Sequence, residues 1–179
     1  VVNAAKKGWR WQWDQLMNEL APSDQYGNYS RPNNISPKQG IEIPTKADLL
    51  SREKNQYPWL IIGKSCPWAH RAWLVYQIKE LNQSINLYIA NVDHQSGKWC
   101  LDQKLFGCKS LLELYLKCGR SPHHRATVPV LYDPGNPNKS SPKLICNEST
   151  ILIEILNKWP IFGKNIELSP IQYEEEIKH

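Results

Sequence analysis

The pattern of apolar and polar residues predicts an alternation of strands and helices from residue 58 onward. A short unbroken apolar run closed by Gly63 is typical of a buried strand and a turn, and it predicts a strand over 58–62. Apolar side chains then recur every three or four residues, which predicts a helix over 67–82. Cys66 is therefore expected where a strand leads into the first turn of a helix, with Pro67 at the first helical position, which favours proline.

The remaining apolar patterns complete an α/β order. They predict a strand at 85–92, a helix at 110–118, strands at 128–132 and 143–146, and a helix at 148–158. The second strand can pair parallel to the first because a helix lies between them. Residues 133–142 are rich in turn-forming types and favour a connection between antiparallel strands. This βαβ–αββα order is that of a thioredoxin-like fold.

Residues 1–57 differ in character and are predicted to form an irregular extension that packs on the core. Three alternating tryptophans, Trp9, Trp11 and Trp13, lead into a short amphipathic helix over 14–20, and the stretch 23–46 is expected to be an extended loop. Such tryptophans could form a stacking platform for sugars or bases. Packing is favoured because aromatic rings bury large areas and rarely stay exposed without a partner.

The predicted organisation therefore has three parts. The extension covers 1–57, the core domain covers 58–160, and 161–179 is expected to be a linker or tail.

Composition and charge narrow the possible function classes. The chain has 179 residues, 41% of them hydrophobic and 22% charged, and no apolar run approaches the roughly 18 residues that a membrane span needs. The net charge of +5 comes from scattered basic residues, without the basic patch typical of a nucleic-acid binder. We therefore expect a cytoplasmic protein that binds neither nucleic acid nor a membrane.

The cysteines do not form a disulfide or zinc pattern. Five irregularly spaced cysteines include no CxxC pair, so neither a disulfide framework nor a structural metal site is indicated. The nearest approach to a metal cluster is Cys118 with His123 and His124, which lacks a fourth ligand at suitable spacing. No metal is expected.

Cys66 is the candidate for chemistry. The unpaired N–H groups and the positive end of the dipole at a helix N-terminus favour the thiolate, which is the nucleophilic form of cysteine. His70 and Arg71 would add positive charge if their side chains turned toward the sulfur. The alternative is that Cys66 is a small buried apolar residue, as most unpaired cysteines are.

Three ordered stretches carry a family resemblance. They are Cys-Pro-Trp-Ala-His-Arg at 66–71, Ala-Thr-Val-Pro-Val-Leu-Tyr-Asp at 126–133 and Asn-Glu-Ser-Thr-Ile at 147–151. Together they resemble the motifs of the glutathionyl-hydroquinone reductases, the Xi class of glutathione transferases, which are relatives of the Omega class. The resemblance covers about residues 57–160 and implies the family's thioredoxin-like N-terminal domain.

The resemblance implies a catalytic residue and a set of glutathione-binding residues. Cys66 would be catalytic and glutathione the co-substrate. The binding residues implied are Trp68, Trp99, Val128, Pro129, Glu148 and Ser149. Lys98 separates Gly97 from Trp99, whereas the family has an adjacent Gly-Trp pair, so a packing role for Trp99 stays open.

Local conformational preferences also bear on two of these sites. Proline at the start of a strand would remove a ladder hydrogen bond, and a cis Val128–Pro129 bond would leave the Val128 backbone open to an extended peptide. Asn147 is a good helix N-cap, and Glu148 in the first turn would complement the dipole without any ligand. In the functional reading, this helix end binds the γ-glutamyl carboxylate and Glu148 pairs with the ligand's ammonium.

The reaction that the resemblance implies is the reduction of S-glutathionyl adducts such as glutathionyl-hydroquinones. Ala69 occupies the place of a second cysteine, so a second glutathione would have to release the enzyme. The partners expected are glutathione and an S-glutathionylated small molecule. Members of the family also have a helical C-terminal domain, which we expect to be absent from this chain; a homodimer is expected if the full-length protein has it.

Two alternatives remain open. One is a glutaredoxin-like monothiol thioltransferase, and the other is a non-catalytic thioredoxin-fold module used for interaction.

Overall fold

The computed structural model describes most of the chain after residue 40. The described residues are 41–93, 95–121, 125–137, 140–160, 163–173, 175 and 176, together with Lys6, Gly8, Trp11 and Gln12. The chain divides into two units, 1–34 and 35–179, and the second carries the sheet. The helix predicted at 14–20 lies outside the described residues, as do Trp9, Trp13 and most of the predicted loop.

The second unit is built from short helices and five strands in the described part of the chain. The elements are α2 (Lys46–Leu50), η1 (Lys54–Gln56), β1 (Trp59–Gly63), α3 (Pro67–Ile78), η2 (Leu81–Gln83), β2 (Asn86–Val92), β3 (Trp99–Cys100), α4 (Gln103–Phe106), α5 (Leu111–Lys117), β4 (Val130–Asp133), β5 (Lys143–Cys146), α6 (Ser149–Asn157) and η3 (Ile171–Tyr173). Every predicted strand and helix between 58 and 158 is present, with its ends shifted by a few residues.

The strands form one mixed sheet in the order β3-β2-β1-β4-β5. β1 pairs parallel with β2 and antiparallel with β4, and β4 pairs antiparallel with β5. The predicted parallel pair and the predicted antiparallel pair are therefore both confirmed. Leu60 and Ile61 in β1 have no exposed surface, as expected for a central strand that is covered on both faces.

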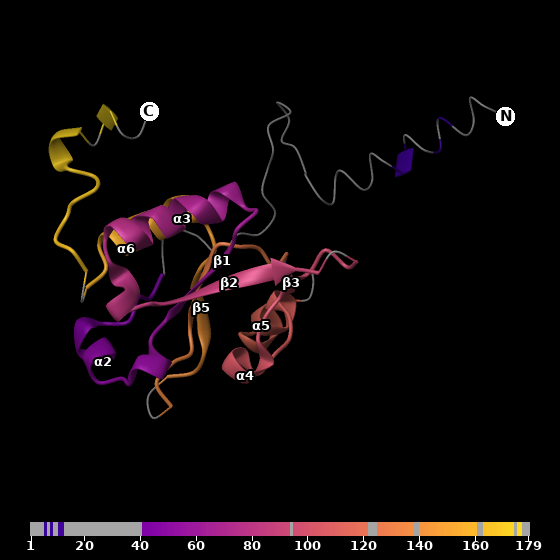
Figure 1. Ribbon diagram of the computed structural model, residues 1–179, viewed down its shortest axis with the longest axis horizontal. Helices are drawn as coiled ribbons and strands as arrows, with labels where there is room; N and C mark the ends of the chain where they lie inside the picture. The colour runs from indigo at the N-terminus through magenta and orange to yellow at the C-terminus, as the bar shows by residue number, and fades with distance from the viewer. Residues whose placement is uncertain are drawn as a thin grey trace. The chain divides into compact units, whose positions relative to one another are not determined.

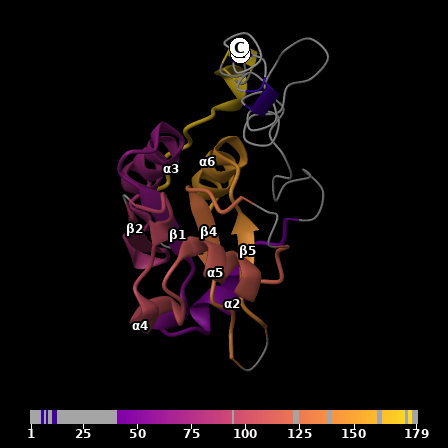
Figure 2. The same ribbon diagram turned by 90° about the vertical axis from the view of Figure 1, so that its right-hand side faces the viewer.

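Helices cover both faces of this sheet. Figures 1 and 2 show α3 and α6 side by side on one face, with α5 on the opposite side. The parallel β1–β2 pair requires a crossover, and α3 provides it. No helix in the described ranges combines the length and the apolar character needed to cross a membrane.

The differences from the predicted elements have local causes. α3 ends at Ile78, four residues early, because Glu80 adopts the left-handed conformation with φ 52° and breaks the helical path. β4 begins at Val130, two residues late, because the prolyl residue before it lacks an N–H and its peptide bond is cis. β3 and α4 were not predicted, since two and four residues are too short to show a period.

The segment before β1 is more ordered than a loop. α2 begins at Lys46, capped by the Thr45 hydroxyl, which accepts a hydrogen bond from the Asp48 N–H at 3.2 Å. Leu49 is fully buried in the core. Arg52 is also buried, and its guanidinium pairs with the carboxylate of Asp133 at the end of β4. Part of the predicted extension is thus packed on the core by apolar contacts and by a buried ion pair.

Candidate functional site

Cys66 lies where the sequence predicted it, at the junction between β1 and α3. It is the N-cap residue of α3, and Pro67 follows at the first helical position. The thiol is half-buried, and it donates a hydrogen bond to the carbonyl of Val128 at 3.4 Å. The residue is therefore partly exposed, and its sulfur is held against the segment that precedes β4.

The basic side chains after Cys66 contact aromatic rings. The Arg71 guanidinium lies 5.9 Å from the centre of the Trp68 ring, a cation–π geometry. His70 makes an edge contact with Trp73 at 6.1 Å between ring centres. Trp68 is 54% exposed although it lies in the first turn of α3, two residues after Cys66.

The segment before β4 has the backbone geometry that was predicted. The Val128–Pro129 peptide bond is cis. Both residues are buried, and the Val128 carbonyl points at the Cys66 thiol. Residues 66 and 128 are thus brought together by a direct contact across the end of the sheet.

The third motif forms the start of α6, with one correction. The N-cap is Glu148, and the prediction that Asn147 caps the helix is wrong. The Asn147 amide instead donates to the Thr127 hydroxyl at 3.3 Å, which ties this turn to the residue before Val128. Ser149 is only 1% exposed, and its hydroxyl is one of the few buried polar atoms without a hydrogen-bond partner in the described structure.

Trp99 is placed by the end of β1. A Cβ atom added at Gly63 would lie 2.3 Å from two carbons of the Trp99 ring, so the indole rests directly on the glycine. The ring is half-buried and belongs to the short edge strand β3. This geometry supports a packing role for Trp99, while its contact with glutathione stays a prediction.

We expect the substitution Gly63→Ala to destabilise the fold by about 1–3 kcal/mol, because the methyl group would displace the Trp99 ring. Urea unfolding of both proteins measures this difference. In a Trp99→Ala background the methyl group has room, so the same substitution should have a much smaller effect. An equal effect in both backgrounds would show that the ring contact is not the cause.

Two residues near the site were missed by sequence reasoning. The Tyr115 hydroxyl, from the middle of α5, donates to the Thr127 carbonyl at 2.9 Å. The Cys146 thiol accepts from the Glu148 N–H at 3.4 Å. In the sequence, these two residues appear only as polar groups on helix or strand faces predicted to be buried. The sequence does not indicate which partners such groups contact.

The remaining cysteines differ in their exposure to solvent and in their acidity. Cys100 is exposed, and Cys108 and Cys146 are buried. Desolvation by burial raises the pKa of Cys118 and of Cys146 to about 11, and the pKa of Tyr132 to about 12. These groups therefore stay neutral at physiological pH.

This burial predicts a loss of stability in alkali. The unfolded chain releases these protons near the ordinary values of 9.0 for cysteine and 10.0 for tyrosine, below the folded values. The stabilisation is therefore complete below about pH 9 and is lost as the pH rises through the folded pKa values. We expect the urea midpoint to fall between about pH 9 and about pH 12, and to fall less in the Cys118→Ala and Cys146→Ala variants. Identical pH profiles for all three proteins would contradict this account.

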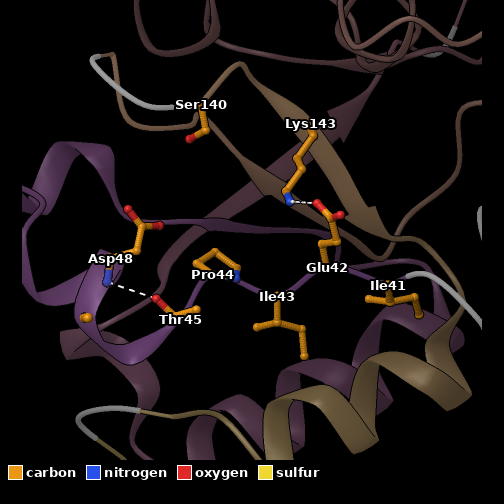
Figure 3. Close-up of a pocket in the computed structure, with 9 residues that line it drawn as sticks. Ile41, Glu42, Ile43, Pro44, Thr45, Asp48, Ser140 and Lys143 are labelled. Atoms are coloured by element: carbon orange, nitrogen blue, oxygen red, sulfur yellow. Dashed lines mark hydrogen bonds and ion pairs between the residues drawn. The ribbon is translucent and has the colours of Figure 1, made fainter.

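A groove on the surface lies apart from these residues. Figure 3 shows its lining, in which the Lys143 ammonium points to the Glu42 carboxylate at 3.2 Å and the side chains of Ile41, Ile43 and Pro44 add apolar surface. None of the predicted site residues lines it. The groove is therefore not part of the candidate site.

Metal ligands do not gather in the described structure. Within the described ranges no three His, Cys, Asp or Glu side chains are placed to hold an ion. His123 and His124 lie outside the described residues.

The fold and the site define a class of protein. A mixed five-stranded sheet, a cysteine at the N-terminus of the crossover helix and a cis-proline opposite the thiol are the features of a thioredoxin-like domain of the glutathione transferase type. The family of the glutathione S-transferase N-terminal domain matches residues 65–159, and the chain belongs to it.

Individual relatives agree with this assignment. Glutathionyl-hydroquinone reductase YqjG of Escherichia coli is 31% identical over 128 residues, which are 66% of this chain and 37% of the relative. Glutathionyl-hydroquinone reductase PcpF of Sphingobium chlorophenolicum is 28% identical over 105 residues, or 55% of this chain and 32% of the relative. The chain thus spans about a third of the length of the curated relatives it matches.

Solved structures give the same fold. The glutathione-bound structure of YqjG from Escherichia coli matches with a TM-score of 0.56 and 28% identity, over 68% of this chain and 41% of that chain. The Xi glutathione transferase ECM4 of Saccharomyces cerevisiae matches with a TM-score of 0.62, over 83% of this chain and 52% of that chain; at 22% identity it supports the fold alone. The prediction of a thioredoxin-like α/β fold is confirmed.

Proposed function

We propose that this chain is the glutathione-binding part of a cysteine-type glutathione transferase that reduces S-glutathionyl adducts, glutathionyl-hydroquinones being the first candidates. One observation carries the proposal: three segments far apart in the sequence meet at the Cys66 thiol and the start of α6. Cys66 contacts Val128, and the residue before Val128 is bonded to Asn147. The names of the relatives, two of them glutathionyl-hydroquinone reductases, support the substrate class.

Each segment would bind one part of glutathione. The Val128 backbone before the cis-proline would pair with the cysteinyl part of the extended tripeptide. The first-turn N–H groups of α6, with Ser149, would bind the γ-glutamyl carboxylate. Glu148 would pair with the ammonium group. The unpartnered hydroxyl of Ser149 supports this assignment, since buried polar atoms without a partner are rare and often mark a ligand site.

The chemistry follows from one thiol without a neighbouring second thiol. The Cys66 thiolate would attack the glutathionyl sulfur of the adduct and form an enzyme–glutathione disulfide. The electrons of the broken sulfur–carbon bond would stay with the carbon fragment, which takes up a proton and leaves. Because Ala69 occupies the place of a second cysteine, a glutathione thiolate would then attack the mixed disulfide. Glutathione disulfide leaves and the Cys66 thiolate is restored.

A glutaredoxin-like thioltransferase would use the same site and the same mixed disulfide. It would differ in its leaving group, which would be a small thiol. The exposure of Trp68, two residues after Cys66, favours an aromatic leaving group, because an exposed indole can stack on a ring. A cytoplasmic location and the boundaries at residues 57 and 160 remain predictions.

Two measurements test the proposal. After incubation with glutathione disulfide, intact mass should show one glutathione on the protein, and peptide mapping should place it on Cys66 rather than on the exposed Cys100. Turnover of a glutathionyl-hydroquinone should then exceed turnover of a glutathionylated small thiol. If no adduct formed on Cys66, the non-catalytic interaction module would be the remaining hypothesis.

A further inference from the structure

A polar cluster with two buried members and one half-buried member joins the two backbone segments of the candidate site. It consists of Tyr115 in α5, Thr127 before the cis-proline, and Asn147 before α6; we call these three residues the Tyr115 cluster. Tyr115 is 1% exposed and Asn147 3% exposed. Neither Tyr115 nor Thr127 belongs to the residues assigned above to glutathione or to the reaction.

The hydrogen bonds of the Tyr115 cluster converge on Thr127. The Tyr115 hydroxyl donates to the Thr127 carbonyl at 2.9 Å, and the Asn147 amide donates to the Thr127 hydroxyl at 3.3 Å. Thr127 is thus hydrogen-bonded to both other members of the cluster.

The cluster links parts of the fold that are otherwise separate. α5 and α6 lie on opposite sides of the sheet (Figures 1 and 2), and the cluster bridges them at the end of the strands. Thr127 is one residue before Val128, and Asn147 is one residue before Glu148 and two before Ser149. A displacement of either cluster member therefore moves a backbone segment assigned to glutathione.

Desolvation by burial keeps the Tyr115 hydroxyl protonated. It raises the pKa of this group above its ordinary value, although the polar groups of Asn147 and Thr127 act in the opposite direction. The hydroxyl is thus a permanent donor to the Thr127 carbonyl. Removing it would leave that carbonyl without this donor in a low-dielectric surrounding, where an unmade hydrogen bond has its largest effect.

We propose that Tyr115 is a positioning residue of the glutathione site: through Thr127 and Asn147 it fixes the distance between the Val128 backbone and the start of α6, and so sets glutathione affinity. This inference rests on the proposed function. It predicts that the cluster affects binding of the tripeptide rather than the reaction at Cys66, since no cluster member touches the sulfur in the described contacts.

The variant Tyr115→Phe tests the inference. Its matched control is Tyr76→Phe, because the Tyr76 hydroxyl is also buried and also donates to a backbone carbonyl, that of Ile85 at 3.1 Å, away from the site. We expect Tyr115→Phe to weaken glutathione binding about 10-fold by calorimetry, with a matching rise in KM for glutathione and kcat within about twofold. The control should lose similar stability and keep its affinity.

A second variant, Thr127→Val, tests the inference independently if Tyr115→Phe does not fold. Thr127→Val keeps the carbonyl that accepts from Tyr115 and removes the hydroxyl that accepts from Asn147. Thr127→Val should also weaken glutathione binding. The double variant Tyr115→Phe/Thr127→Val should lose less affinity than the sum of the two single losses, because both substitutions act on the same cluster. Equal affinities of the wild type, both single variants and Tyr76→Phe would overturn the inference and leave the proposed function intact. Failure of the wild type itself to bind glutathione would overturn both.

Discussion

Replacing Cys66 with serine is expected to reduce the turnover of S-glutathionyl substrates by at least about 10²-fold. Serine can still donate to the Val128 carbonyl, so the contact that holds residue 66 is kept. An alcohol does not ionise at physiological pH and cannot form a disulfide with glutathione. The variant therefore removes the nucleophile while leaving the residues assigned to glutathione unchanged.

The same variant should keep its affinity for glutathione, because the groups assigned to the tripeptide lie on the Val128 segment and at the start of α6. Cys100→Ser is the matched control, since Cys100 is the exposed cysteine of the described structure and has no place in the mechanism. Steady-state turnover and calorimetric binding of the three proteins measure both effects. If Cys66→Ser were as active as Cys100→Ser, another group would be the nucleophile.

The position of Cys66 could be predicted because its signals are local. The apolar run of β1, the turn at Gly63 and the helical period after Pro67 are all read within about twenty residues, and they do not depend on the rest of the fold. The same holds for the strands around the turn at 133–142. The cis bond before Pro129 was expected from the family motif and from the loss of an N–H, and it is present.

The errors and omissions concern contacts between distant residues. Asn147 is a good N-cap by type, but its amide bonds to Thr127, twenty residues earlier, and a single sequence does not report that contact. Trp99 rests on Gly63 because β3 pairs with the far end of β2, a two-residue pairing with no period of its own. Side-chain partners across the sheet depend on register, which periodicity alone does not give.

Arg52 is the clearest case of a partner that the sequence did not indicate. It lies in a stretch predicted to be an extension, 81 positions before Asp133. Its guanidinium donates to the Asp133 carboxylate at 2.5 and 3.3 Å and to the Gln56 carbonyl at 3.2 Å, and it also contacts the Asp48 carboxylate. The side chains of Arg52 and Asp133 are each only 2% exposed. The ion pair therefore joins α2 to the end of β4 inside the protein.

We expect Arg52→Met to lower the free energy of unfolding by about 3–5 kcal/mol, because it leaves the Asp133 carboxylate buried without its cation. Methionine fills a similar volume, so the effect is electrostatic rather than a cavity effect. Urea unfolding measures the loss.

Two further variants distinguish two causes of the stability loss: the unpaired buried charge of Asp133 and the lost packing of the arginine side chain. Lys143→Met removes a cation from the exposed pair with Glu42, whose side chains are 38% and 84% exposed, and should change stability by less than about 1 kcal/mol. Adding Asp133→Asn to Arg52→Met removes the unpaired charge while keeping an acceptor for the Gly135 N–H, which Asp133 binds at 2.9 Å. That double variant should regain part of the lost stability. If it were less stable than Arg52→Met, the loss would come from packing of the arginine, and α2 would be held to the sheet by its apolar contacts instead.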